Sequence, residues 1–112
     1  MLPKENRLKK RKEFNSVFRE GKSVSNRFLE IKIKEMEGKK IGFVAPIKRF
    51  KKATDRNYVK RKLRESFRDL LDEIPENTGI IVIAKKAIKG KSVKETREIM
   101  NDLLSGIKTK NR

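Results

Sequence analysis

A strongly basic stretch that also has a helical apolar pattern constrains this chain more than any other feature. Residues 48–64 read KRFKKATDRNYVKRKLR, and nine of these seventeen residues are Lys or Arg. Apolar residues recur every three or four positions through this stretch and beyond it, which indicates an amphipathic helix with one buried face. They are Val59, Leu63, Phe67, Leu70 and Ile74. We therefore expect a long helix over 54–73, with Thr54 or Asp55 as its N-cap.

The rest of this predicted helix is cationic. No acidic residue falls between Asp55 and Glu65, although exposed helices often place Glu near Lys or Arg to form ion pairs. A solvated surface is the simpler interpretation, but a rigid, guanidinium-rich face is also suited to binding phosphates. The whole chain carries 32 Lys and Arg, 15 Asp and Glu, and a net charge of +17, which points to a polyanionic partner.

Missing residue types exclude several chemistries. The 112 residues include neither Cys nor His, which removes disulfides, Cys nucleophiles, His-based triads and thiolate or imidazole metal sites. Asp69, Asp72 and Glu73 are acidic neighbours, but nothing beside them completes a two-metal nuclease site. The chain shows neither an apolar run of the ~20 residues that a membrane span needs nor a secretory signal. A cytoplasmic protein is the expectation.

The remaining pattern predicts a mixed α+β fold in one domain over 1–112, with 1–11 and 107–112 flexible. Expected elements are a helix over 12–20 ended by Gly21, a connector over 23–26, strands over 27–35, 41–45 and 47–50, the helix over 54–73, a strand over 80–84, a basic loop over 85–91 and a helix from 93 that Gly106 stops. Alternation marks the first strand, and continuous apolarity marks the last as covered on both faces. Ser92 and Glu95 match a capping box.

The order of these elements predicts their arrangement. A strand that follows a long helix should lie parallel to an earlier strand. The simplest architecture is one sheet with helices packed largely on one face.

The basic stretch, extended to KRFKKATDRNYVKRKLRESFR at 48–68, resembles the protein subunit of bacterial ribonuclease P. In that family an Ala is followed by Arg-Asn, then Lys-Arg, then a further Arg. The matching residues here are Ala53, Arg56, Asn57, Lys60, Arg61 and Arg64. RLKKRKEFNSVFREGKSV at 7–24 is similar to the family's first helix, and IPENTGIIVIAKK at 74–86 is similar to the strand after the signature. The resemblance covers about the whole chain in order and spacing.

The resemblance implies a fold and a function. The fold is a two-layer α/β (α+β) sandwich of order αβββαβα, with a mixed sheet and a left-handed βαβ crossover, against the usual rule. The family protein binds a large catalytic RNA and holds the 5′ leader of precursor tRNA in a cleft between the first helix and the sheet. The RNA hydrolyses the phosphodiester with Mg²⁺, so the protein is expected to have no catalytic residue, metal or cofactor of its own.

The resemblance also implies which residues bind RNA. Those facing the catalytic RNA are Lys52, Arg56, Asn57, Lys60, Arg61, Arg64 and Arg68. Those of the leader cleft are Phe14, Phe18, Phe28 and Lys32, and auxiliary basic contacts come from Arg7, Lys9, Lys10, Arg11, Lys48 and Arg49. Core packing is the alternative for the aromatic residues. The basic residues of 7–12 and 85–91 are expected to give further phosphate contacts, with a general electrostatic envelope as the alternative.

Three positions depart from the family pattern. Lys51 stands where Gly is common, the 45–47 segment is less regular, and Lys32 occupies a place that is often apolar or aromatic. A Lys at that place can contact a phosphate. Two other functions stay open: a different nucleic-acid binder such as a ribosomal protein, and an autonomous protein nuclease, which the missing His disfavours. No second protein is expected to be required.

Overall fold

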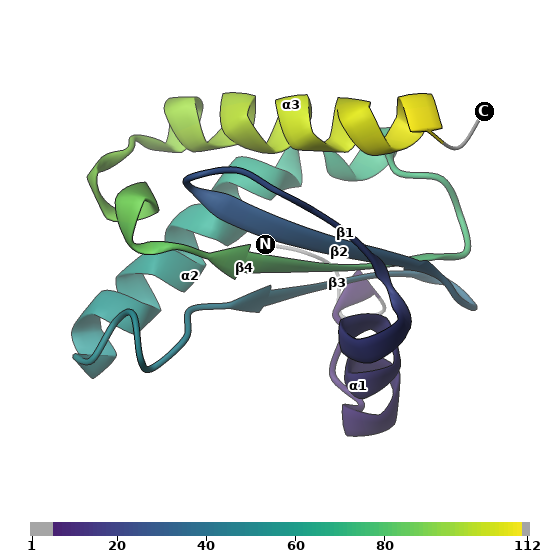
Figure 1. Cartoon of the computed structure of the whole chain (residues 1–112), viewed down its shortest axis with the longest axis horizontal. Coiled ribbons are helices and arrows are strands. Elements are labelled where there is room, and N and C mark those ends of the chain that lie inside the picture. The colour runs from purple at the N-terminus through teal and green to yellow at the C-terminus, as the bar shows by residue number, and fades with distance from the viewer. Residues whose placement is uncertain (1–5, 111–112) are drawn as a thin grey trace.

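The computed structural model describes residues 6–110, and it places a four-stranded sheet between helices (Figure 1). The elements are α1 (Arg11–Glu20), β1 (Lys22–Ser25), β2 (Leu29–Glu35), β3 (Lys39–Val44), α2 (Ala53–Arg68), the 3₁₀ turn η2 (Leu71–Glu73), β4 (Thr78–Ala84), the 3₁₀ turn η3 (Lys86–Gly90) and α3 (Val93–Lys110). Among these helices, none is both long and apolar enough to cross a bilayer.

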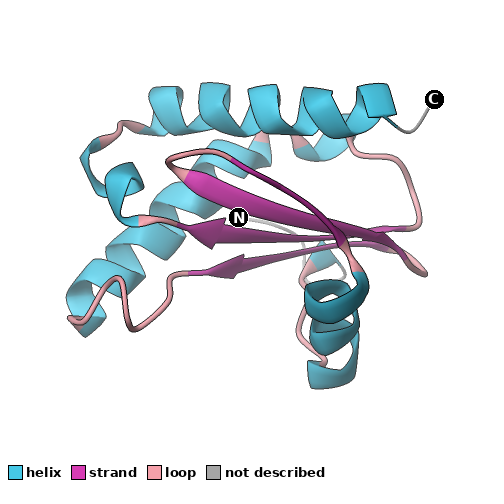
Figure 2. Ribbon diagram, in the orientation of Figure 1, coloured by secondary structure: helices cyan, strands magenta, loops and turns pink. Residues whose placement is uncertain are grey.

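The sheet is mixed and has the strand order β1-β2-β4-β3 (Figure 2). β2 pairs antiparallel with both β1 and β4. β3 pairs parallel with β4, which confirms the expected parallel strand, and α2 makes the crossover between the two. The handedness of that crossover stays a prediction.

Both faces of β4 are covered, as its apolar sequence predicted. Ile80, Val82 and Ala84 belong to the larger core cluster with residues of α2 and α3, whereas Ile81 and Ile83 belong to a smaller cluster with Val17 of α1. All seven residues of this strand are buried. The helices α2 and α3 thus form the second layer, and α1 lies on the opposite side of the sheet (Figure 1).

Helix α2 follows the predicted apolar phase. Val59, Leu63 and Phe67 are fully buried. The helix ends at Arg68, short of the predicted residue 73, and Pro75 further along excludes the helical conformation from the residue before it. Ile74 accordingly has extended backbone angles, and a 3₁₀ turn intervenes. The predicted caps are wrong too, since Lys52 occupies the N-cap position and makes no side-chain cap bond.

Other boundaries also differ from the expectation. The predicted connector 23–26 overlaps β1, a polar edge strand in which Val24 pairs with Ile31. The predicted strand 47–50 is a turn, in which the amide of Phe50 donates to the carbonyl of Pro46 at 2.9 Å. The strand β1 could not be recognised from the sequence, because an edge strand needs only backbone partners and its side chains show little apolar pattern.

The last helix begins as expected and ends later. The capping box is confirmed, because the amide of Glu95 donates to Ser92 Oγ at 3.0 Å and the amide of Ser92 to Glu95 Oε1 at 3.1 Å. The helix then continues past Gly106 to Lys110, so the predicted stop is wrong. A glycine within a helix costs only ~1 kcal/mol relative to Ala. Of the segments predicted to be flexible, 1–5 and 111–112 lie outside the described residues.

The chain before α1 lies along the outer edge of the sheet. The amide of Leu8 donates to the carbonyl of Ile41 at 3.0 Å, and Arg7 forms a parallel bridge with Ile41. Asn6 Nδ2 donates to the carbonyl of Lys39 at 2.7 Å. Residues 6–8 are therefore part of the folded structure, contrary to the expected flexibility of that segment.

Candidate nucleic-acid interface

The outer face of α2 presents an uninterrupted polar and cationic row. Asn57, Arg61, Arg64 and Arg68 are all exposed, and they follow one another at helical intervals of four, three and four. This spacing places them on one side of the helix, opposite the buried side formed by Val59 and its neighbours. We call these four residues the outer row. Arg68 also pairs with Glu65 at 3.1 Å, and Lys60 lies half-buried beside the row.

Two predicted RNA contacts, Arg56 and Arg49, also have a structural role. Arg56 Nη1 donates to the carbonyl oxygens of Phe50 and Lys51, both at 2.9 Å. Arg49 Nη1 donates to the carbonyl of Ala84 at 3.0 Å. Both guanidinium groups therefore fix the backbone of the segment between β3 and α2. The sequence pattern gave no sign of these bonds, since they depend on where that segment turns.

A basic hollow lies at the N-terminal end of α2. It measures about 430 Å³ and draws its lining from the segment before α2, the first turn of α2 and the turn η3. The lining residues are Lys48, Arg49, Phe50, Lys51, Lys52, Asp55, Lys86 and Lys89. Asp55 is the acidic member, and it pairs with Lys89 at 3.1 Å. The structure thus brings the predicted Lys48, Arg49 and Lys52 together with two cations of the 85–91 segment.

A second hollow, of about 350 Å³, joins the N-terminal segment to α2. Its lining includes Arg7, Lys9 and Arg64, with Gly42 and Phe43 of β3. Arg7 and Lys9 were predicted as auxiliary contacts and Arg64 as part of the signature, and they meet here across the edge strand. Lys10 and Arg11 are exposed at the start of α1. A larger hollow of about 670 Å³ near Ile33, Ile74 and Leu104 contains none of the predicted site residues.

The α1 side of the sheet assembles three of the four predicted leader-cleft residues. The rings of Phe14 and Phe18 stack with centroids 6.2 Å apart. Lys32 Nζ lies 4.9 Å from the centre of the Phe18 ring, and Phe18 is 43% exposed. A cation close to an exposed aromatic ring is an arrangement that can hold an unpaired base and its phosphate.

Phe28 lies elsewhere. It packs against the core cluster on the α2 and α3 side, with Arg27 and Lys91 over its ring at 5.4 and 5.0 Å. The structure therefore does not place Phe28 beside Phe14 and Phe18, where it was predicted. Phe28 precedes β2, and the amide of Lys85 donates to its carbonyl at 3.0 Å, so strand alternation does not set the direction of this ring.

Ion pairs surround the exposed aromatic residues on this side. Lys40 pairs with Glu13 at 2.9 Å and Lys34 with Glu20 at 2.9 Å. Lys34 also donates to Ser16 Oγ. The hydrogen bond and charge of Lys34, with the Ser16 hydroxyl, lower the pKa of Glu20. Lys32, the cation beside Phe18, is itself 3.9 Å from a carboxylate oxygen of Glu30.

The acidic residues after α2 do not gather into a metal site. Asp69 forms an ion pair with Arg97 of α3. Within the described part of the chain, no three or more His, Cys, Asp or Glu side chains are placed to hold a metal ion together. The nuclease alternative therefore gains no support from this region.

Fold and site together define a class: small, basic α+β proteins whose crossover helix carries a row of exposed cations. A family model described as Ribonuclease P matches residues 2–108. The ribonuclease P protein component of Shouchella clausii is 31% identical over 96% of this chain and 89% of its own length. That of Clostridium botulinum (strain Loch Maree) is 36% identical over 90% of this chain and 93% of its own.

Solved structures agree with this. The ribonuclease P protein of Thermotoga maritima is similar with a TM-score of 0.73 and 34% identity, over 87% of this chain and 94% of that one. The Staphylococcus aureus protein gives a TM-score of 0.76 with 25% identity, over 92% of this chain and 95% of that one. The chain belongs to the ribonuclease P protein family, the protein component of an endoribonuclease of tRNA processing.

Proposed function

We propose that this protein is the RNA-binding subunit of a ribonuclease P holoenzyme. It binds the catalytic RNA through the outer row of α2 and the two basic hollows beside it. The RNA carries out the Mg²⁺-dependent cleavage, and the protein screens the repulsion between the phosphates of enzyme and substrate. The proposed compartment is the cytoplasm.

One observation carries this proposal. The four residues of the outer row are exposed on the side of α2 that faces away from the core. Their cations do not contribute to packing, while fixed guanidinium groups on a rigid helix suit phosphate recognition. Membership of the family supplies the identity of the RNA.

The same subunit is proposed to hold the 5′ leader of precursor tRNA. Phe14, Phe18 and Lys32 on the α1 side offer stacked rings with a cation at hand. Single-stranded RNA is commonly bound by stacking its unpaired bases on aromatic side chains. Leader and catalytic RNA would then occupy opposite sides of the sheet.

Reconstitution tests the proposal. The protein is mixed with ribonuclease P RNA and precursor tRNA at low Mg²⁺, and the 5′ end of the product is mapped. Accurate removal of the leader is expected from the mixture, with no cleavage by the protein alone. Cleavage by the protein without RNA would make it a nuclease in its own right. No stimulation of the RNA would favour a different nucleic-acid binder, such as a ribosomal protein.

A further inference from the structure

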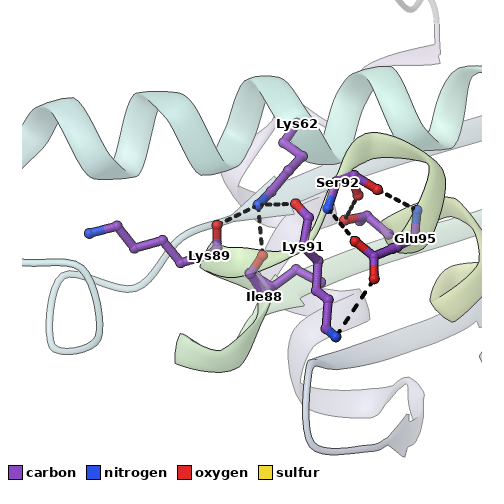
Figure 3. Close-up of polar contacts among 7 residues, drawn as sticks. Lys62, Ile88, Lys89, Lys91, Ser92 and Glu95 are labelled. Carbon is purple, nitrogen blue, oxygen red and sulfur yellow. Dashed lines mark hydrogen bonds and ion pairs between the residues drawn. The ribbon is translucent and has the colours of Figure 1, made fainter.

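Lys62 lies within the basic signature but points into the protein. The residue is only 5% exposed. Nζ donates to the carbonyl oxygens of Ile88 at 2.6 Å, Lys89 at 3.0 Å and Lys91 at 2.8 Å (Figure 3). Three carbonyl oxygens match the three N–H donors of an ammonium group. Burial lowers the pKa of Lys62, and the charge of Glu95 acts in the opposite direction.

This contact joins α2 to the segment between β4 and α3. Figure 3 shows the Lys62 side chain reaching from the helix to the end of η3. The ring of Tyr58 lies 5.0 Å from the same Nζ. One turn further along α2, Ser66 Oγ donates to the carbonyl oxygens of Lys62 at 2.7 Å and of Val93 at 3.2 Å. Lys62 and Ser66, on the inner side of α2, thus hold the backbone of the segment between β4 and α3.

The segment so held supplies part of the basic hollow. Lys86 and Lys89 line that hollow together with Lys51 and Lys52. Lys62 is not among the lining residues, and its ammonium is occupied by carbonyls. An η3 backbone that is free to move would spread its two lysines over many positions, and each ordered contact would then cost more conformational entropy.

We propose that Lys62 is a positioning residue for RNA binding, which holds the 86–91 segment by three carbonyls so that Lys86 and Lys89 complete a phosphate-binding hollow with Lys51 and Lys52. The inference rests on the proposed function, since it names residues that act in the same RNA interface. The ligand is a nucleic-acid phosphate. Lys62 influences its binding without touching it.

The main test is the salt dependence of binding to ribonuclease P RNA. Lys62→Met keeps an apolar stem and removes all three donors. The salt slope is the slope of log K for binding against log salt concentration, and its magnitude grows by about one for each phosphate contact, because each contact releases about one counterion from the RNA. In Lys62→Met this magnitude should fall by about two, as if Lys86 and Lys89 were lost. The matched control Lys94→Met removes the same charge from an exposed site on α3 and should change the slope by at most about one.

A mutant cycle separates positioning from general stability. In a background of Lys86→Ala with Lys89→Ala, Lys62→Met should reduce the slope no further, because the residues it positions are gone. An equal decrease in both backgrounds would overturn the proposal. So would a folded Lys62→Met protein with the slope of the unmodified protein.

A second route serves if Lys62→Met does not fold. The sequence contains no Cys, so Lys62→Cys provides a single thiol that can be alkylated in denaturant. Bromoethylamine restores an ammonium at the lysine position, whereas iodoethanol gives a hydroxyl of the same length. The aminoethylated protein should bind with the original slope and the hydroxyethylated one with the reduced slope. Equal slopes would contradict the positioning role.

Lysine labelling of the unmodified protein needs no variant at all. With acetic anhydride, Lys62 should react slowly in both free and RNA-bound protein, while Lys86 and Lys89 should become protected only when RNA is bound. Equal reactivity of Lys86 and Lys89 in both states would overturn the inference.

If Arg61→Ala weakens RNA binding but Lys62→Met does not, only the positioning role fails. If neither matters and binding is flat in salt, the proposed function itself fails.

Discussion

The two sides of the sheet are built in different ways. On one side, α2 and α3 enclose the larger core, and the cations of the outer row lie beyond it on the far surface of α2. On the other side, α1 covers a small cluster around Val17 and Ile81, and the candidate binding residues Phe14 and Phe18 belong to the covering helix itself. The outer row thus binds with residues that do not pack the core, whereas on the α1 side packing and candidate binding share residues.

This difference determines how easily the binding residues can be substituted without loss of the fold. Substitutions in the outer row should leave the core untouched. Substitutions on α1 affect packing in proportion to burial, and Phe18 is the more exposed of the two rings. The difference also extends to chemistry, because the α2 side offers many exposed cations and the α1 side offers stacked rings near the ion-paired Lys32, Lys34 and Lys40.

The largest expected effect concerns salt. If the α2 side neutralises some 6–10 phosphates, affinity for the catalytic RNA should fall by ~10³–10⁵ between 50 and 200 mM salt. The preference for precursor over mature tRNA should change far less over the same range, because stacking carries little charge. Titrations of both equilibria against salt measure this. An affinity that does not change with salt would exclude the electrostatic role assigned to the α2 side.

A paired substitution on α2 tests the separation of packing from binding. Leu63→Ala removes a fully buried side chain and should lower the free energy of unfolding by ~2–5 kcal/mol. Arg61→Ala should leave stability nearly unchanged, since the side chain is exposed, while it reduces the salt slope for RNA binding by about one. Thermal denaturation and RNA titration of each variant suffice. Unfolding by Arg61→Ala with a stable Leu63→Ala would reverse the assigned faces.

On the α1 side, Phe18→Ala should weaken binding of precursor tRNA to the assembled holoenzyme by ~1–3 kcal/mol, the contribution of one base stacked on an aromatic ring. Lys32→Ala should act in the same direction. Mature tRNA has no leader, so its affinity is the control and should hardly change. Equal losses for the two substrates would assign these residues to packing or to the catalytic-RNA surface.

The smallest effect comes from two exposed carboxylates, one on each side. Hydrogen bonds from the Ser92 amide and hydroxyl lower the pKa of Glu95, and Lys34 lowers that of Glu20. A carboxyl with a depressed folded pKa stabilises the protein at neutral pH, and this stabilisation is lost as the pH falls through the folded value. The difference in Tm between the unmodified protein and Glu95→Gln should therefore shrink on acidification. A constant difference would exclude a contribution from the charge.

The sequence predicted best what burial dictates. The phase of Val59, Leu63 and Phe67 gave the inner side of α2, and continuous apolarity gave β4. The outer row followed from the same phase. Lys62 was missed because its charge suggested exposure, although its helical position next to Leu63 and four residues before Ser66 puts it on the inner side.

Other misses have their own physical causes. β1 is an edge strand held by backbone pairing, so Lys22–Ser25 carries almost no apolar signal. The roles of Arg49 and Arg56 depend on where the chain turns after Pro46, which brings carbonyls to their guanidinium groups. Phe28 lies just outside a strand, where alternation no longer fixes the direction of a side chain.

The backbone contacts of the N-terminal segment have a further consequence, for how copies of this protein meet one another. An edge strand with open amides and carbonyls is a template on which another chain can pair. The bond from Leu8 to Ile41 and the bridge at Arg7 occupy part of the outer edge of β3, and the opposite edge, β1, is only four residues long. With a net charge of +17 on every copy, the sheet gives little opportunity for strand exchange or fibrous association.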